Sequence, residues 1–151
     1  MNNNDYMNWF EYFIAIAETV KLKSKDKDTQ IGAVIVGRDN EIISTGYNSF
    51  PRNINDDVAI RNHRPEKYYW MSHAETNAIV NAALIGVSTR DSTMYTTSGI
   101  PCADCARNII NAGIRKLYYK KECTTKDDRW KEHAYRSAQM LLEANVNIIE
   151  Y

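Results

Sequence analysis

Hydrophobic residues recur at helical spacing near the start of the chain. Trp9, Phe13, Ile16 and Val20 lie three or four positions apart, and Asp5 precedes them. Side chains at this spacing share one side of a helix, and a carboxylate before the first turn can accept its free backbone N–H groups. The pattern therefore predicts an amphipathic helix with Asp5 available as its cap.

The hydrophobic pattern then changes to one typical of paired strands. Residues 31–36 and 41–45 are rich in β-branched side chains, and the polar residues 37–40 separate them. Two such runs joined by a short polar segment predict a β-hairpin. A long irregular stretch follows, at roughly 48–68.

The second half of the chain alternates between helical and extended patterns. We expect a helix to start near Ser72 and to stop by Gly86, because glycine commonly ends helices. The remaining expected elements are a strand at 94–97, a helix ending near Gly113, a strand at 116–120, a helix at 130–143 and a strand at 146–149. In the helix at 130–143 the spacing places Leu141 and Leu142 inward.

A β-hairpin followed by alternating helices and strands is typical of a layered α/β protein. We expect a three-layer α/β/α sandwich around a mixed five-stranded sheet. The sequence contains no repeat, linker or low-complexity tract that would divide it. Residues 1–151 are therefore predicted to form a single domain.

Charge and composition narrow the classes of function. Nineteen basic and nineteen acidic residues give a formal net charge of zero, so a basic surface for nucleic acid or for an anionic membrane is not expected. The start of the chain lacks the pattern of a signal peptide, and no stretch approaches the roughly 18 apolar residues of a membrane helix. The odd number of cysteines, three, fits a reducing compartment. We expect a cytoplasmic protein, in the host cytoplasm if it is viral, without nucleic acid or membrane as a partner.

Two short motifs carry the candidate chemistry. They are His73-Ala-Glu75 and Pro101-Cys-Ala-Asp-Cys105. His73, Cys102 and Cys105 supply three zinc ligands, whereas a structural zinc site normally has four. Three protein ligands, an open fourth position for water and a nearby carboxylate are typical of a catalytic zinc site.

The predicted helices give these residues a geometry. His73 would lie in the first turn of one helix, and Cys102 and Cys105 in the first turn of the next, so two helix N-termini could converge on one metal. Their partial positive charge would stabilise the thiolates. Glu75 would lie about 200° around an ideal helix from His73, poorly placed to bind the same ion but suited to move protons. The motifs thus predict hydrolytic deamination.

The two motifs resemble the H-x-E and P-C-x-x-C signature of the zinc-dependent nucleoside and nucleotide deaminases. Within that superfamily the chain is most similar to the deoxycytidylate (dCMP) deaminases, over roughly residues 9–120. The likeness extends to Ser24-Lys-Asp26, Gly46-Tyr-Asn48 and residues 64–68. It implies a cytidine deaminase-like fold and conversion of dCMP to dUMP and ammonia, which supplies dUMP for thymidylate synthesis. It also implies a homo-oligomer, often a hexamer in this family. We expect one zinc ion per subunit, because the long insertion offers only His63 as a ligand for the second, structural zinc of some phage relatives.

The resemblance further implies a set of residues that contact the substrate. Asn48 resembles the family's sugar-contacting asparagine, and Ser24 and Lys25 resemble part of the loop that meets the 5′-phosphate. The backbone around 97–100 would face the pyrimidine and its leaving amino group. The implied substrate-binding residues are Ser24, Lys25, Asn48, Ala74, Thr97 and Ser98.

Regulation is a further expectation from the resemblance. Many dCMP deaminases bind the effectors dCTP and dTTP, with Mg²⁺, near the loop after G-Y-N, which implies Arg52, Asn53 and Asp57 as effector candidates. This chain has Ser49 and Asn53 where the family usually has glycine. Asparagine is the better of the two substitutes where the backbone needs a positive φ.

The motifs leave several alternatives open. The cysteines could be a redox pair, or His63 or Cys123 could complete a structural zinc site in a binding module without catalysis. Among enzymes, tRNA adenosine deaminase and the deaminases of free cytidine, blasticidin or a riboflavin precursor are rivals. The acidic and apolar C-terminus and the Ser24-Lys25 loop favour a free pyrimidine nucleotide as substrate.

Overall fold

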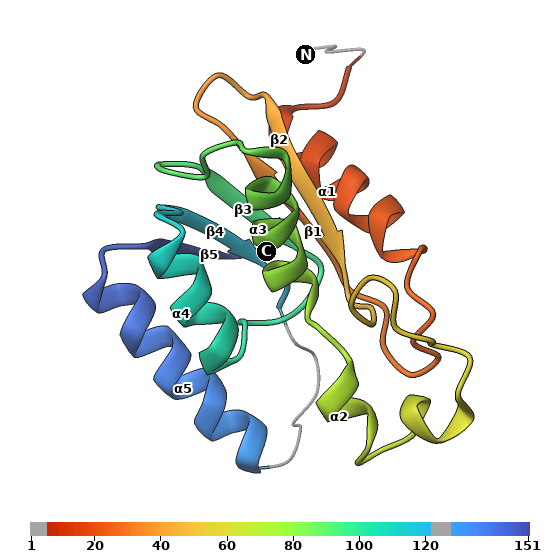
Figure 1. Ribbon diagram of the computed structural model, residues 1–151. Helices are drawn as coiled ribbons and strands as arrows, with labels where there is room; N and C mark the ends of the chain where they lie inside the picture. Colours follow the sequence, from red (N-terminus) through yellow and green to blue (C-terminus); the bar gives the residue numbers. More distant parts are fainter. Residues whose placement is uncertain (1–5, 122–127) are drawn as a thin grey trace.

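The computed structural model describes residues 6–121 and 128–151, with side chains at 128 and 129 left aside (Figure 1). Asp5, the expected helix cap, and Cys123, the alternative zinc ligand, lie outside the described residues. The elements in chain order are α1 (Trp9–Lys21), β1 (Gly32–Val36), β2 (Ile42–Tyr47), the 3-10 helix η1 (Ala59–Asn62), α2 (Lys67–Trp70), α3 (Ala74–Ile85), β3 (Thr93–Thr96), α4 (Ala103–Asn111), β4 (Lys116–Tyr119), α5 (Asp128–Glu143) and β5 (Asn147–Glu150).

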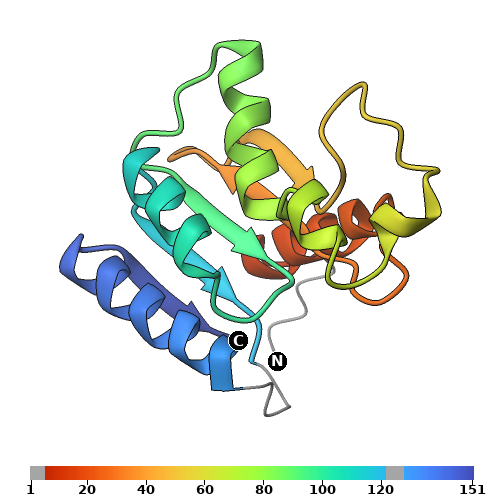
Figure 2. The ribbon, with the colours of Figure 1, turned by 60° about the horizontal axis from the view of Figure 1, so that its bottom comes forward.

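The five strands form one mixed sheet in the order β2-β1-β3-β4-β5. β1 pairs antiparallel with β2 and β3, whereas β3, β4 and β5 are parallel neighbours. Helix α1 covers one face of the sheet, and α3, α4 and α5 cover the other (Figures 1 and 2). The predicted three-layer α/β/α sandwich with a mixed five-stranded sheet is therefore confirmed.

Strand β1 lies between β2 and β3 and is buried along its whole length. Because side chains alternate across a strand, β1 contributes to two hydrophobic cores. Val34 packs with Phe13 and Ala17 beneath α1, and Ile35 packs with Ala78 beneath α3. A strand covered on both faces reads as a continuous apolar run, which is the pattern seen at 31–36.

Helix α1 begins with a capping box rather than with an isolated carboxylate. The Asn8 side chain accepts a hydrogen bond from the backbone N–H of Glu11, and the Glu11 carboxylate accepts one from the backbone N–H of Asn8. Phe13 is fully buried, whereas Trp9, predicted on the same side, is 58% exposed. The first residue of a helix can extend beyond the core that its later turns cover.

The C-terminal helix α5 packs through a narrower stripe than its sequence predicts. Leu141 is fully buried, but Leu142 is 59% exposed, so its predicted inward position is wrong. Adjacent residues point about 100° apart on a helix, and one sheet face cannot cover both. Ser137, one turn before Leu141, is fully buried instead.

Helix α3 lies unusually close to the edge strand β2. A Cβ atom on Gly46 would lie 2.3 Å from the Ala78 backbone nitrogen and 2.4 Å from the Ala74 carbonyl oxygen. The Ser44 hydroxyl donates to the Ala78 carbonyl oxygen over 2.7 Å, and the Asn77 amide donates to the Tyr47 carbonyl oxygen over 2.8 Å. Strand β2 thereby fixes the position of the helix that carries Glu75.

Within the described residues, no helix is both long and apolar enough to cross a membrane.

Candidate functional site

The N-terminal ends of α3 and α4 meet at one place and bring the three predicted zinc ligands together. His73 is the N-cap of α3, Cys102 is the N-cap of α4, and Cys105 lies in the first turn of α4. The His73 Nδ1 atom lies 3.4 Å from Cys102 Sγ and 3.3 Å from Cys105 Sγ. His73 therefore precedes the helix rather than lying in its first turn, since its backbone is extended.

This group of donors suits zinc. Two sulfurs and one imidazole nitrogen are typical zinc ligands, and tetrahedral coordination would separate a nitrogen and a sulfur ligand by about 3.6 Å. The three candidate ligand atoms lie within 4.8 Å of one another. Both cysteines are buried, whereas His73 is exposed at the edge of the cluster. A metal held here would therefore be reached from the His73 side.

The three side chains also perturb one another's pKa values. Hydrogen bonding from Cys105, and then from His73, lowers the pKa of Cys102 to about 4. The hydrogen bond with the Cys102 sulfur raises the pKa of His73 to about 9, and the same sulfur raises the pKa of Cys105. Zinc ligands bind in their deprotonated forms, so binding displaces the protons on His73 and Cys105.

Glu75 is directed at this cluster and is only 3% exposed. Its Oε1 atom accepts hydrogen bonds from Thr96 Oγ1 over 3.0 Å and from Ser98 Oγ over 2.6 Å. Its Oε2 atom lies 3.7 Å from Cys105 Sγ. Two hydroxyl donors on one oxygen fix the orientation of the carboxylate and leave the other oxygen beside the ligand cluster.

These contacts add to the expectations for the loop after β3. The backbone around Ser98 is expected to face the base, and the Ser98 hydroxyl donates to Glu75. Thr96 was not singled out, although its fully buried hydroxyl contacts the same carboxylate oxygen. The only hint in the sequence was its position on a predicted strand that leads into the cysteine motif.

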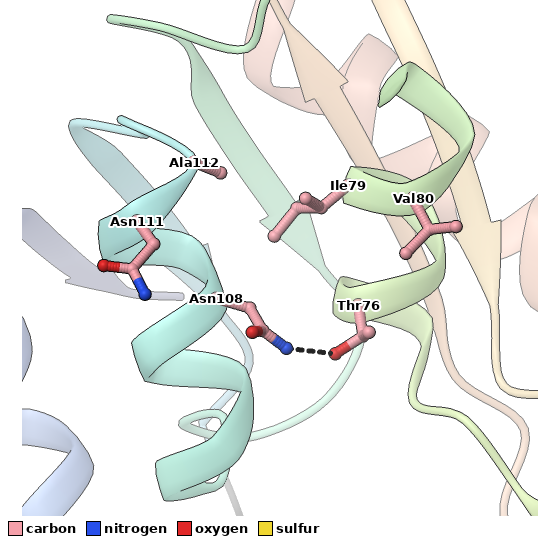
Figure 3. A pocket seen from close by; sticks show the side chains of 6 residues that line it. All are labelled: Thr76, Ile79, Val80, Asn108, Asn111 and Ala112. Carbon is pink, nitrogen blue, oxygen red and sulfur yellow. Dashed lines mark hydrogen bonds between the residues drawn. The ribbon is translucent and has the colours of Figure 1, made fainter. Parts of the chain in front are cut away.

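A groove lies between α3 and α4 (Figure 3), and its residue Thr76 contacts the cluster. The Asn108 amide donates to Thr76 Oγ1 over 3.1 Å, and that oxygen lies 3.6 Å from Cys105 Sγ. Because the Thr76 oxygen accepts from Asn108, its own proton is free to point at the sulfur. The groove is lined by Thr76, Ile79, Val80, Asn108, Asn111 and Ala112.

The predicted sugar and phosphate residues lie side by side, and their polar groups are mostly used within the protein. Asn48 is 6% exposed; its Oδ1 atom accepts from the Ile31 backbone N–H and its Nδ2 atom donates to the Thr29 carbonyl oxygen, each over 2.8 Å. The Ser24 hydroxyl donates to the Asn48 carbonyl oxygen over 2.8 Å. These hydrogen bonds hold the loop itself, and the expected contacts of these residues with sugar and phosphate stay predictions.

Lys25, the third residue of that prediction, points outward. Its side chain is 66% exposed, and its Nζ atom lies 2.9 Å from Asp56 Oδ1 and 3.7 Å from Asp57 Oδ1. The hydrogen bond with Asp56 raises the pKa of Lys25. Lys25 is thus an accessible cation of this loop, as is the exposed Lys27, and Lys25 is paired with the segment that follows β2.

The remaining predicted residues take several roles. Ala74 is fully buried in the core, and Thr97 exchanges hydrogen bonds with Gly32 on β1. The Arg52 guanidinium donates to Asn81 on α3. Asn53 adopts a left-handed backbone with φ of 66°, consistent with the expectation that it substitutes for glycine.

Comparison with known proteins identifies relatives of this arrangement. Residues 7–121 match the family model of the cytidine and deoxycytidylate deaminase zinc-binding region. Human deoxycytidylate deaminase is 38% identical over 124 residues, covering 79% of this chain and 68% of its own. The deoxycytidylate deaminase of enterobacteria phage T2 is 35% identical over 153 residues, covering 76% of this chain and 79% of its own.

Solved structures show the same relationship. The dCMP deaminase of cyanophage S-TIM5, solved in complex with dCMP and dUMP, superposes with a TM-score of 0.76 at 25% identity, covering 97% of this chain and 100% of the phage enzyme. A tRNA:A34 deaminase superposes with a TM-score of 0.51 at 28% identity, covering 75% of this chain and 77% of its own. Taken with the match over residues 7–121, these findings show that the chain belongs to the cytidine and deoxycytidylate deaminase zinc-binding family.

Proposed function

We propose that this chain is a deoxycytidylate deaminase, which hydrolyses dCMP to dUMP and ammonia and so supplies dUMP for thymidylate synthesis. The observation that carries the proposal is the position of Glu75, held by two hydroxyls beside the His73, Cys102 and Cys105 cluster. The human and phage relatives are named deoxycytidylate deaminases, and the cyanophage structure contains dCMP and dUMP. These relatives favour a pyrimidine nucleotide over the other substrates of the superfamily.

In the proposed mechanism His73, Cys102 and Cys105 would hold one zinc ion per subunit. Zinc bound there would supply the Lewis acidity that makes water nucleophilic at neutral pH. Glu75 accepts one proton from the attacking water and delivers it to a ring nitrogen; it then accepts the second water proton, from the hydroxyl now bonded to the ring carbon, and passes it to the leaving amine. A positioned carboxylate of this kind adds about 10² to 10⁴ in rate. One water molecule is consumed and one ammonia molecule is released.

The proposed substrate contacts follow the loops around this centre. Asn48 contacts the sugar, Ser24 and Lys25 meet the 5′-phosphate, and the backbone at Ala74 and Thr97 faces the base. The exposed Lys25 ammonium supports its part, because a phosphate can compete with Asp56 for it. Ser98 acts in the site through its hydrogen bond to Glu75.

Regulation and assembly complete the proposal. dCTP and dTTP, with Mg²⁺, would act through Arg52, Asn53 and Asp57, and the contact from Arg52 to Asn81 would link this loop to α3.

The chain acts as one domain of 1–151 and forms a homo-oligomer, with the hexamer as the expected form. Its proposed location is the cytoplasm, or the host cytoplasm if it is viral.

The test is ammonia release from a panel of substrates. The purified protein is supplied with dCMP, dCTP, deoxycytidine, cytidine and a tRNA anticodon stem, each with and without added dCTP and dTTP. We expect dCMP to give the highest kcat/KM. Higher turnover of deoxycytidine would contradict the phosphate contacts, and turnover of the tRNA stem alone would favour an adenosine deaminase.

A variant separates an enzyme from a zinc-stabilised binding module. We expect Glu75→Gln to lose nearly all deamination while its zinc content, measured by atomic absorption, stays at one per subunit. Glu143→Gln, at an exposed position of α5, is the matched control and should keep both. Unchanged turnover in Glu75→Gln would remove Glu75 from the mechanism.

A further inference from the structure

A lysine of helix α2 is buried against the loop that precedes β1. The Lys67 side chain is 6% exposed. Its Nζ atom lies 3.2 Å and 3.1 Å from the two carboxylate oxygens of Asp26 and 2.9 Å from Asp28 Oδ2. Lysine is almost never buried without a partner, and here two carboxylates supply hydrogen-bond acceptors for its ammonium group. The arrangement is specific rather than a chance surface pair.

The Asp26 carboxylate organises the loop of residues 24–30 around itself. Its Oδ1 atom accepts hydrogen bonds from the backbone N–H groups of Asp28 over 2.9 Å and Thr29 over 3.3 Å. Its Oδ2 atom accepts one from the Asn48 side-chain amide over 3.4 Å. Ser24 Oγ accepts from the Asp26 backbone N–H over 3.2 Å. One buried carboxylate therefore connects the proposed sugar residue with the proposed phosphate loop.

Lys67, the other member of the ion pair, lies close in sequence to the candidate metal ligand His73. Lys67 lies on α2, and only residues 71 and 72 separate α2 from His73. Ser72 exchanges backbone hydrogen bonds of 3.1 Å and 2.9 Å with Ser49, next to Asn48. These contacts hold together loop 24–30, residues 48–49 and the segment that leads into α3. The ion pair between the Lys67 ammonium and the Asp26 carboxylate joins α2 to the loop.

We propose that the Lys67–Asp26 ion pair positions the nucleotide: it sets the place of Asn48 and of loop 24–30 relative to His73, and thereby the affinity for dCMP and the preference for it over deoxycytidine. This inference rests on the proposed deaminase function. Lys67 is a positioning residue, because it acts through Asp26. A role in stability alone accounts less well for this ion pair, because a buried ion pair stabilises a protein little more than hydrophobic residues of the same volume would.

The variants are chosen to separate positioning from folding. Lys67→Met keeps much of the side-chain volume without the charge, and Asp26→Asn keeps the shape of the carboxylate. The double variant removes both charges, so that neither is left buried alone, and Lys67→Arg restores a cation. Arg38→Met, which breaks the exposed pair with Asp91, is the control for loss of an ion pair elsewhere.

Kinetics provide the first measurement. Turnover of dCMP by the unaltered protein tests the proposed function by itself. In Lys67→Met, Asp26→Asn and the double variant we expect KM for dCMP to rise about tenfold or more, because small displacements of a binding group are costly, with kcat changed less than about threefold. The ratio of kcat/KM for dCMP over deoxycytidine should fall by a similar factor, and Lys67→Arg should recover part of both. Arg38→Met should match the unaltered protein.

Binding provides the second measurement and does not depend on turnover. In a Glu75→Gln background, calorimetry with dCMP should show about a tenfold weaker Kd when Lys67→Met is added. An unchanged Kd and an unchanged substrate ratio would overturn the positioning role while leaving the deaminase assignment in place. Loss of zinc and of thermal stability in step with activity, in the double variant as well, would also overturn it, because the pair would then be structural.

Discussion

Thr76 links the groove between α3 and α4 to a metal ligand. The Asn108 amide donates a hydrogen bond to the Thr76 hydroxyl oxygen. The Thr76 hydroxyl can therefore donate its own proton to Cys105 Sγ. Groups that orient metal ligands typically change metal affinity by about 10- to 100-fold when removed. We expect Thr76→Val to weaken zinc binding within that range, measured by competition with a chromophoric chelator.

Two further variants make this expectation specific. Thr76→Ser keeps the hydroxyl and should keep the zinc affinity. Asn111→Ala changes another residue that lines the same groove and should have no effect on zinc binding. Equal chelator competition by Thr76→Val and the unaltered protein would show that the hydroxyl does not support the sulfur ligand.

Ser98 and Thr96 should affect turnover without affecting the metal. Both donate to Oε1 of Glu75, and a hydrogen bond to a charged group contributes about 1.5–3 kcal/mol. Ser98→Ala and Thr96→Val are therefore expected to lower kcat by about tenfold or more while the zinc content stays constant. Thr93→Val, on the same strand β3, serves as the control. A drop in zinc content that parallels the drop in kcat would assign the two hydroxyls to the metal site instead.

The difference between these residues shows which kinds of site residue a sequence can predict. Metal ligation restricts residue type and spacing so strongly that His73, Cys102 and Cys105 could be chosen before any geometry was known. The direction of a hydroxyl is not restricted in this way, and the contacts of Thr96 and Ser98 with Glu75 were not predicted. Lys67 lies in the segment 64–68 that resembles the family, but its role could not be predicted, because its partner Asp26 is 41 positions away.

At the scale of elements, hydrophobic periodicity predicted the long helices and the sheet. Elements of three or more turns, such as α1 and α3, and strands buried on both faces leave a clear pattern. The stretch predicted as irregular at 48–68 contains η1 and the first residues of α2. Both of these helices are only four residues long. One turn of helix is too short to show a period, so contacts such as that between Lys67 and Asp26 decide its place.

The close contact between β2 and α3 makes Gly46 a sensitive position. An alanine there would bring its Cβ within 2.4 Å of backbone atoms of α3, which cannot rotate away. Such overpacking typically costs about 1–3 kcal/mol, occasionally more. We expect Gly46→Ala to lower the free energy of unfolding by at least this amount, measured by urea denaturation, and to weaken zinc binding because α3 carries His73 at its start.

A second glycine supplies the control for Gly46. At Gly37 an added Cβ would meet only the flexible side chain of Glu41, which can move. Gly37→Ala should therefore change stability much less. If both substitutions had the same small effect, the contact between β2 and α3 would be adjustable and would not fix the site.

At the scale of the whole molecule, the outer surface of α3 bears on the proposed oligomer. Val80, Leu84 and Ile85 are 47%, 67% and 62% exposed on this helix. Contiguous exposed apolar side chains commonly mark sites of protein association. If α3 lies in a subunit interface, the active-site helix of each subunit is supported by its neighbour, so assembly and activity should be lost together.

The oligomer can be tested by placing charge on that surface. Light scattering of the unaltered protein should give a mass several times the 17.4 kDa of one chain. Leu84→Glu should lower the mass and the dCMP turnover, because a carboxylate buried in an apolar interface is strongly disfavoured. Leu22→Glu alters an equally exposed apolar residue, 66%, just after α1 and should leave the mass unchanged. A monomeric but fully active protein would show that catalysis does not require assembly and that α3 needs no support from a second chain.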